Sequence, residues 1–148
     1  MIKVALVGAG KMGVSHLAIL GAHPDVEVVG VCDTSKIVTN FLERYSKLNC
    51  YADFEKMLDR VKPEAVFIAV PTKFHHKLIK MALERNIHVF AEKPFCLNTK
   101  EGEELIELAS RKKLINQVGY HNKFVGTFKE VKKIIKAGMI GDVYHFVA

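Results

Sequence analysis

The fold is decided by the stretch Ile2-Lys-Val-Ala-Leu-Val-Gly8-Ala-Gly10-Lys-Met-Gly13. An apolar run typical of a buried strand ends in glycines spaced G-x-G-x-x-G, and a helical pattern follows at once. Dinucleotide-binding folds require this order of strand, glycine turn and helix. We expect Gly8 to permit the tight turn, Gly10 to let a pyrophosphate approach the backbone, and Gly13 to let helix and strand pack closely.

The helix after the glycines has a second role in this interpretation. Its first turn would direct free N–H groups and the positive end of the helix dipole at the phosphates. The whole turn is therefore predicted to contact the cofactor, through Gly8, Ala9, Gly10, Lys11, Met12 and Gly13.

A carboxylate lies where the ribose of such a cofactor is expected. Residues 26–33 predict a second buried strand, and Asp33 ends it, 20 positions after Gly13. This is close to the spacing of roughly 20 at which an acidic residue accepts the ribose hydroxyls. The carboxylate repels a 2′-phosphate and so favours NAD, while Thr34 and Lys36, with Ser35 between them, offer a phosphate pocket that keeps NADP as the alternative. A cap on the following helix is the other role that suits Asp33.

The composition indicates a globular protein that works without metal, membrane or nucleic acid. Hydrophobic residues make up 49% and charged residues 26% of the chain, and no apolar run approaches the roughly 18 residues of a membrane span. The three cysteines show no C-x-x-C spacing, which predicts a cytoplasmic protein without a metal or redox pair. The net charge of +6 invites a nucleic-acid role, but the basic residues alternate with acidic ones along helical patterns, which favours solvated faces.

Strand-like and helical patterns alternate along most of the chain. Strands are predicted at 2–7, 26–33, 50–52, 64–70, 87–91 and 115–119, with helices at 35–48, 54–61, 73–85 and 99–113 between them. Continuous apolar strands separated by amphipathic helices predict a doubly wound parallel sheet, an α/β Rossmann fold over residues 1–120. Ligands are then expected at the carboxyl ends of the strands.

The last segment, 121–148, departs from this alternation. It predicts a hinge, a helix at 124–138 and a strand from Asp142 to Ala148. Such a strand would be an exposed edge without partners. We therefore expect this segment to begin a second α/β domain that is truncated in this chain.

Polar residues follow three of the later strands. After residues 64–70, Val70, Pro71 and Thr72 are placed to pass beneath the nicotinamide half of the cofactor, and His75 either reaches cofactor or substrate or lies in the first turn of a helix.

After the strand at 87–91 come Glu92, Lys93 and Pro94. Lys93 suits proton transfer to a reacting hydroxyl, because a lysine pKa falls readily on burial. Glu92 suits ribose hydroxyls, and the bond before Pro94 is a candidate cis peptide. A surface Glu–Lys pair in a turn is the alternative.

The third segment follows the strand at 115–119. Gln117, His121 and Lys123 either face the same cleft or are solvated beside apolar residues of a domain junction.

Together these motifs resemble the N-terminal half of the Gfo/Idh/MocA oxidoreductase family. The matching segments are Gly8–Gly13, Val31-Cys-Asp33, Ala69-Val-Pro71-Thr72 with His75, Glu92-Lys93-Pro94, and Gly119–Phe124. The resemblance implies an NAD(P)-dependent oxidoreductase that moves hydride between the nicotinamide and a hydroxyl or carbonyl carbon of a sugar, polyol or sugar nucleotide.

The resemblance also implies residue roles. Lys93 would hydrogen-bond the reacting hydroxyl and assist proton transfer, and Asp33 and Glu92 would bind ribose. His121 and Lys123 are candidate substrate contacts because of their place after the sixth strand. Lys123 is at a position where many members have arginine. A bidentate contact from this position is therefore in doubt, because lysine lacks the guanidinium group. The resemblance implies that a C-terminal domain supplies further catalytic residues and a sheet for homo-oligomerisation into dimers or tetramers, and we expect this domain to be truncated here.

Other functions are open at this point. A stand-alone dinucleotide-binding module without catalysis is the main alternative. A basic nucleic-acid binder on the dinucleotide fold is a weaker one.

Overall fold

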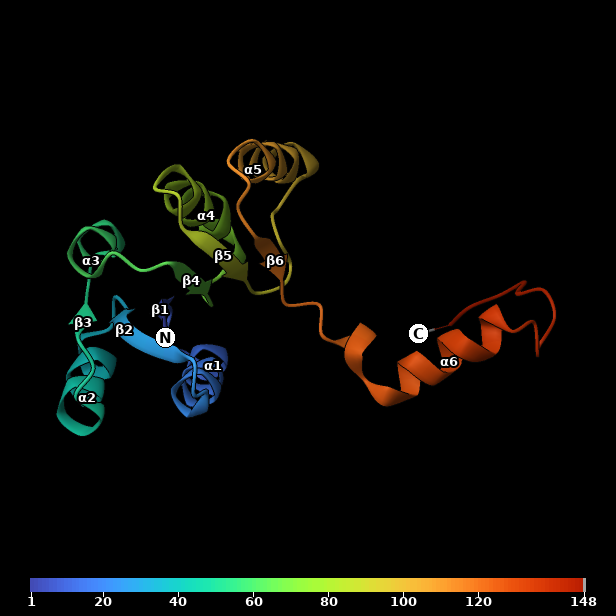
Figure 1. Ribbon diagram of the computed structural model, residues 1–148, viewed down its shortest axis with the longest axis horizontal. Helices are drawn as coiled ribbons and strands as arrows, with labels where there is room; N and C mark the ends of the chain where they lie inside the picture. The colour runs from blue at the N-terminus through green and yellow to red at the C-terminus, as the bar shows by residue number, and fades with distance from the viewer. Residues whose placement is uncertain (148) are drawn as a thin grey trace.

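The computed structural model describes residues 1–147 as a parallel sheet with helices on both faces (Figure 1). The strand order is β3-β2-β1-β4-β5-β6. The strands are β1 (Ile2–Val7), β2 (Val26–Cys32), β3 (Cys50–Tyr51), β4 (Ala65–Ile68), β5 (His88–Ala91) and β6 (Asn116–Val118). The α-helices that alternate with them are α1 (Lys11–Ala22), α2 (Lys36–Ser46), α3 (Phe54–Val61), α4 (His75–Glu84) and α5 (Thr99–Arg111). The predicted doubly wound α/β fold is confirmed, and the strand order reverses between β1 and β4, where such folds bind their ligands.

Two apolar layers hold the helices against the sheet. The larger layer joins the sheet to α3, α4 and α5 through residues such as Met57, Ile79 and Leu105, all fully buried. The smaller layer, around Leu6 and Leu42, lies on the face covered by α1 and α2. The central strands are buried on both faces, which explains why their sequences are continuously apolar rather than alternating.

Most element boundaries lie within a few residues of the prediction. Asp53 caps α3 as its position suggests, accepting a hydrogen bond from Lys56 N at 2.8 Å. The helix predicted at 73–85 is divided into a 3-10 turn, η1 (Thr72–Phe74), and α4.

The end of the described chain leaves the sheet (Figure 1). A 3-10 turn, η2 (Asn122–Phe124), leads into α6 (Gly126–Lys136), which has no buried residue. The predicted strand is wrong for residues 142–147, which form no regular structure. A strand is stable only when a neighbour pairs with its N–H and C=O groups, and no described strand lies beside this segment. Ala148 lies outside the described residues.

No helix of the described residues is both long enough and apolar enough to span a bilayer.

Candidate functional site

The glycine turn between β1 and α1 is shaped by sterics at two of its glycines. Gly8 has φ +89°, and a Cβ there would lie 2.5 Å from the carbonyl oxygen of Ala69. A Cβ on Gly13 would lie 1.8 Å from the carbonyl oxygen of Gly8. The predicted turn and packing roles of these glycines are therefore confirmed, because no larger residue fits either position without moving the backbone.

Gly10 differs from the other two. Its backbone has φ −71°, an ordinary value, and no atom lies within 4 Å of a Cβ built on it. The packing of the protein does not require glycine here. Open space beside the N-terminus of α1 is what a pyrophosphate needs in order to approach the backbone, so this turn fits a dinucleotide.

Asp33 lies immediately after β2 and connects the glycine turn to the start of α2. Its Oδ2 accepts a hydrogen bond from Ala9 N at 2.7 Å, and its Oδ1 accepts one from Ser35 N at 2.8 Å. The cap of α2 is Ser35, so the alternative role of Asp33 as that cap does not apply. The two N–H donors fix the carboxylate beside the glycine turn.

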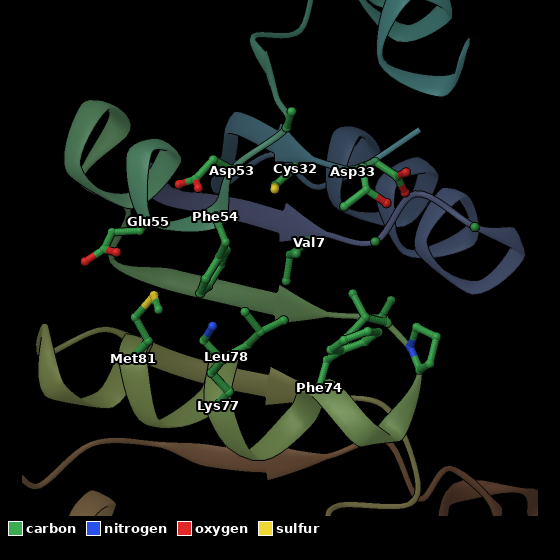
Figure 2. A pocket seen from close by; sticks show the side chains of 17 residues that line it. Val7, Cys32, Asp33, Asp53, Phe54, Glu55, Phe74, Lys77, Leu78 and Met81 are labelled. Carbon is green, nitrogen blue, oxygen red and sulfur yellow. The ribbon is translucent and has the colours of Figure 1, made fainter. Parts of the chain in front are cut away.

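A cavity of about 490 Å³ opens beside this carboxylate (Figure 2). It runs from the glycine turn to α3 and α4, and its volume is that of an ordinary small-molecule site. Figure 2 shows Asp33 near the turn, Asp53 and Glu55 at the start of α3, and Lys77 on α4. The apolar part of the wall includes Phe54, Phe74, Leu78 and Met81.

Cys32 also belongs to this wall, but its thiol is not a nucleophile. Burial, together with the charges of Asp53 and Asp33, raises the pKa of Cys32 to about 12. Burial and Glu101 raise the pKa of Cys96 to about 11. Both thiols stay protonated at neutral pH, and only a thiolate reacts readily. Within the described residues no cluster of three or more His, Cys, Asp or Glu side chains could hold a metal ion.

The segment after β4 forms part of the wall of the large cavity and begins the helix that follows. Val70 and Pro71 line the large cavity, and Thr72 begins η1. His75 is 1% exposed, and its ring nitrogens lie 2.9 Å from the carbonyl oxygen of Val70 and 3.2 Å from that of Phe95. This geometry favours the helix-turn alternative for His75, which joins the segments after β4 and β5; its contact with cofactor stays a prediction.

The segment after β5 places Glu92 and Lys93 in different surroundings. Glu92 is 8% exposed, whereas Lys93 is exposed and lines a cavity of about 180 Å³, so the burial expected for this lysine is not found. The predicted cis peptide between Lys93 and Pro94 is confirmed. Residues 119–123 form the rest of the small cavity, so the structure brings Lys93 together with His121 and Lys123.

A third cavity, of about 380 Å³, adjoins the second. The two share Gly119, Tyr120 and His121. The rest of its wall consists of Met12, His16, Phe90, Glu92, Gln117, Val118 and Phe124. The predicted cofactor residues that line none of these three cavities are Ala9, Lys11, Gly13, Lys36, Thr72 and His75.

Sequence reasoning missed several residues of these walls. They are His16, Asp53, Glu55, Phe74 and Lys77. The one available signal was helical spacing: His16 follows Gly13 by three positions, which turns it to the same side of α1. The others are brought to the site by the pairing of strands far apart in sequence, which no local pattern shows.

A doubly wound sheet, a glycine turn at its reversal point and a carboxylate after β2 define a dinucleotide-binding Rossmann domain. Residues 2–120 match the model of the oxidoreductase family with an NAD-binding Rossmann fold. The chain therefore belongs to this family, Gfo/Idh/MocA, and residues 2–120 are its NAD-binding Rossmann domain.

Known relatives cover nearly the whole chain. D-glucoside 3-dehydrogenase of Escherichia coli (strain K12) is 28% identical over 145 residues, which are 97% of this chain and 41% of the relative. The structure of scyllo-inositol dehydrogenase from Lactobacillus casei with NAD(H) and scyllo-inositol bound matches with a TM-score of 0.87 and 26% identity, over 96% of this chain and 43% of that one. The WlbA dehydrogenase from Bordetella pertussis, in complex with NADH and UDP-GlcNAcA, matches with a TM-score of 0.89 and 25% identity, over 97% and 42% of the two chains. The chain thus spans about two fifths of the length of these relatives.

Proposed function

We propose that this chain forms the cofactor-binding half of an NAD-dependent dehydrogenase acting on a sugar, polyol or sugar nucleotide. The observation that carries the proposal is the fixed carboxylate of Asp33 beside an open glycine turn. Lys93 lies on the same edge of the sheet, after β5. The named relatives are dehydrogenases of substrates of this class.

Each group at the cofactor site has a distinct task in this proposal. The N–H groups at the start of α1 bind the pyrophosphate, and the space beside Gly10 admits it. The oxygens of Asp33 each accept one backbone N–H and keep capacity for a ribose hydroxyl. When bound, NAD takes up the hydride from the carbon that carries the reacting hydroxyl.

The substrate side of the proposal rests on Lys93. Its Nζ holds the reacting hydroxyl and receives its proton, while His121 and Lys123 contact the rest of the substrate from the same small cavity. Residues 121–147 lead away from the sheet, and in the whole protein we place the remaining substrate contacts and the surface for self-association in a second domain. A cytoplasmic location stays a prediction.

NAD is preferred over NADP for an electrostatic reason. Asp33, Asp53 and Glu55 all line the large cavity, and Lys77 is the one lysine or arginine in its wall. A 2′-phosphate placed beside Asp33 would meet like charge, which costs binding free energy.

The second candidate is a dinucleotide-binding module without catalysis. It is favoured by the match of residues 2–120 to an NAD-binding Rossmann domain, compared with a Lys93 cavity of only about 180 Å³. Turnover assays of the chain with inositols and sugars separate the two functions: NAD reduction supports the dehydrogenase, and NAD binding without turnover supports the module.

The cofactor proposal is tested by replacing Asp33→Asn, which keeps the size of the side chain and removes its charge. Isothermal titration should show NAD affinity reduced about tenfold to a hundredfold, because hydrogen bonds to a charged group contribute about 1.5–3 kcal/mol. NADP should lose less affinity than NAD.

Asp25→Asn is the matched control. Asp25 lies just before β2, at the opposite end of the strand from Asp33, and is exposed. The Asp25→Asn substitution removes the same charge as Asp33→Asn and should leave the affinity for NAD unchanged. Equal NAD affinity in both variants would contradict the assignment of Asp33.

A further inference from the structure

Glu92 is a buried carboxylate with a single side-chain partner. Its Oε1 lies 2.8 Å from His16 Nε2, and its Oε2 accepts a hydrogen bond from its neighbour Lys93 N at 3.2 Å. Among residues 1–147, no lysine or arginine forms an ion pair with it. Since a buried carboxylate oxygen without a donor is costly, the Lys93 N–H fixes Oε2 and His16, the side-chain partner, fixes the direction of Oε1.

His16 is itself held in place by the sheet. Its ring contacts Phe67 of β4 at 5.6 Å and Phe90 of β5 at 5.2 Å between centroids, the latter edge-on. Gly119 lies next to the carboxylate, since a Cβ built on it would be 3.4 Å from Glu92 Oε1. The carboxylate is thereby fixed in the wall of the 380 Å³ cavity, while the next residue, Lys93, lines the neighbouring one.

We propose that His16 is a positioning residue that holds the Glu92 carboxylate away from the ammonium group of Lys93. The proposal rests on the role of Lys93 in the proposed function. Released from His16, the carboxylate of the adjacent residue would turn to the lysine Nζ and pair with it. A paired ammonium keeps its proton and is a poor acceptor for the proton of a hydroxyl. His16 thus links the helix of the glycine turn to the reactive lysine.

The test measures the accessibility of unprotonated Lys93 rather than turnover. Reductive methylation with formaldehyde, followed by peptide mass spectrometry, gives the rate for each lysine, with Lys100 as an internal reference. His16→Phe keeps a ring against Phe67 and Phe90 but removes the donor. The Lys93 rate should fall by roughly fivefold or more, because a carboxylate that pairs with an amine favours its protonated form.

Two further variants isolate the carboxylate as the cause. His16→Gln keeps an N–H donor near the position of Nε2 and should retain the wild-type Lys93 rate. Adding Glu92→Gln to His16→Phe should restore the rate, because no carboxylate remains to pair with the lysine.

His76→Phe is the matched control, since His76 Nε2 binds Glu104 at the same 2.8 Å on the other helices α4 and α5. It should leave the Lys93 rate unchanged. If His16→Phe loses stability as His76→Phe does but leaves the Lys93 rate unchanged, the pair is merely structural and the proposal fails. Titration with NAD keeps the two proposals apart: absence of NAD binding by the unmodified chain overturns the proposed function, and the methylation rates still decide the role of His16.

Discussion

At the scale of single residues, the glycine turn must both pack closely within the protein and leave space for the cofactor, and substitutions can separate these two requirements. Gly13 is demanded by contact within the protein, whereas Gly10 faces open space. A methyl group at position 13 would overlap the carbonyl oxygen of Gly8, and a methyl group at position 10 would enter only the space assigned to the pyrophosphate.

We therefore expect opposite outcomes for two alanine substitutions. Gly13→Ala should lower the free energy of unfolding by about 3 kcal/mol, the upper range for overpacking, as measured by urea denaturation. Gly10→Ala should leave stability within about 0.5 kcal/mol, as for a substitution without close contacts, yet weaken NAD binding in isothermal titration. Stable Gly10→Ala protein with wild-type NAD affinity would show that the pyrophosphate does not approach this position.

The residues most accessible to prediction were those with a local cause. Gly8, Gly13 and the position of Asp33 follow from a turn, a close contact and a spacing, all of which are visible in one stretch of sequence. His16 and Glu92 are 76 positions apart and meet only because β1, β4 and β5 are neighbours in the sheet. The sequence identifies such residues individually but not as a pair.

At the scale of elements, α4 and α5 are joined by a small charge cluster on the surface. Glu104 of α5 pairs with Lys80 and with His76, both on α4. The hydrogen bond from Lys80, followed by that from His76, lowers the pKa of Glu104 from 4.5, and the bond to Glu104 raises the pKa of Lys80 from 10.5. The cluster should therefore stabilise the folded state between pH 4.5 and pH 10.5.

The pH dependence of this contribution has a defined sign. Because the pKa of Glu104 is lowered in the folded state, its stabilisation is present above 4.5 and is lost as the pH falls through the lowered value. Glu104→Gln should thus be less stable than the wild type at neutral pH, and the difference in urea denaturation should vanish on acidification.

Glu103→Gln is the control on the same helix, since Glu103 is exposed and makes no ion pair within residues 1–147. It should show no such pH-dependent difference. A Glu104→Gln difference that persists below the lowered pKa would assign the effect to helix propensity instead.

Elements were predictable where local pattern and tertiary packing agree. The helices and central strands meet this condition, because their apolar faces are buried in the two layers that the hydrophobic pattern predicts. In α2, by contrast, Ile37, Phe41 and Tyr45 are exposed, and Leu42 and Val38 pack inward. The segment 142–147 has a strand-like composition but no neighbouring strand, so composition alone misled the prediction.

At the scale of the whole molecule, α6 and the residues after it add apolar surface without adding core. Phe128, Val131 and Ile135 lie on one face of α6 and are 41–52% exposed. None of residues 121–147 is buried. An exposed apolar face of this kind promotes association between molecules.

We expect a chain that ends at Val125 to be as stable as the full one and less prone to associate. Its thermal midpoint should shift by less than about 2 °C, since a loss of 1 kcal/mol would move it by about 2–8 °C for chains of this size range and no buried contact is removed. Sedimentation velocity should show concentration-dependent association of the full chain and little for the shortened one. The double variant Phe128→Glu with Ile135→Glu keeps the length and should also suppress association, which would place the effect on this face of α6. A marked drop in the midpoint of the shortened chain would mean instead that α6 supports the Rossmann core.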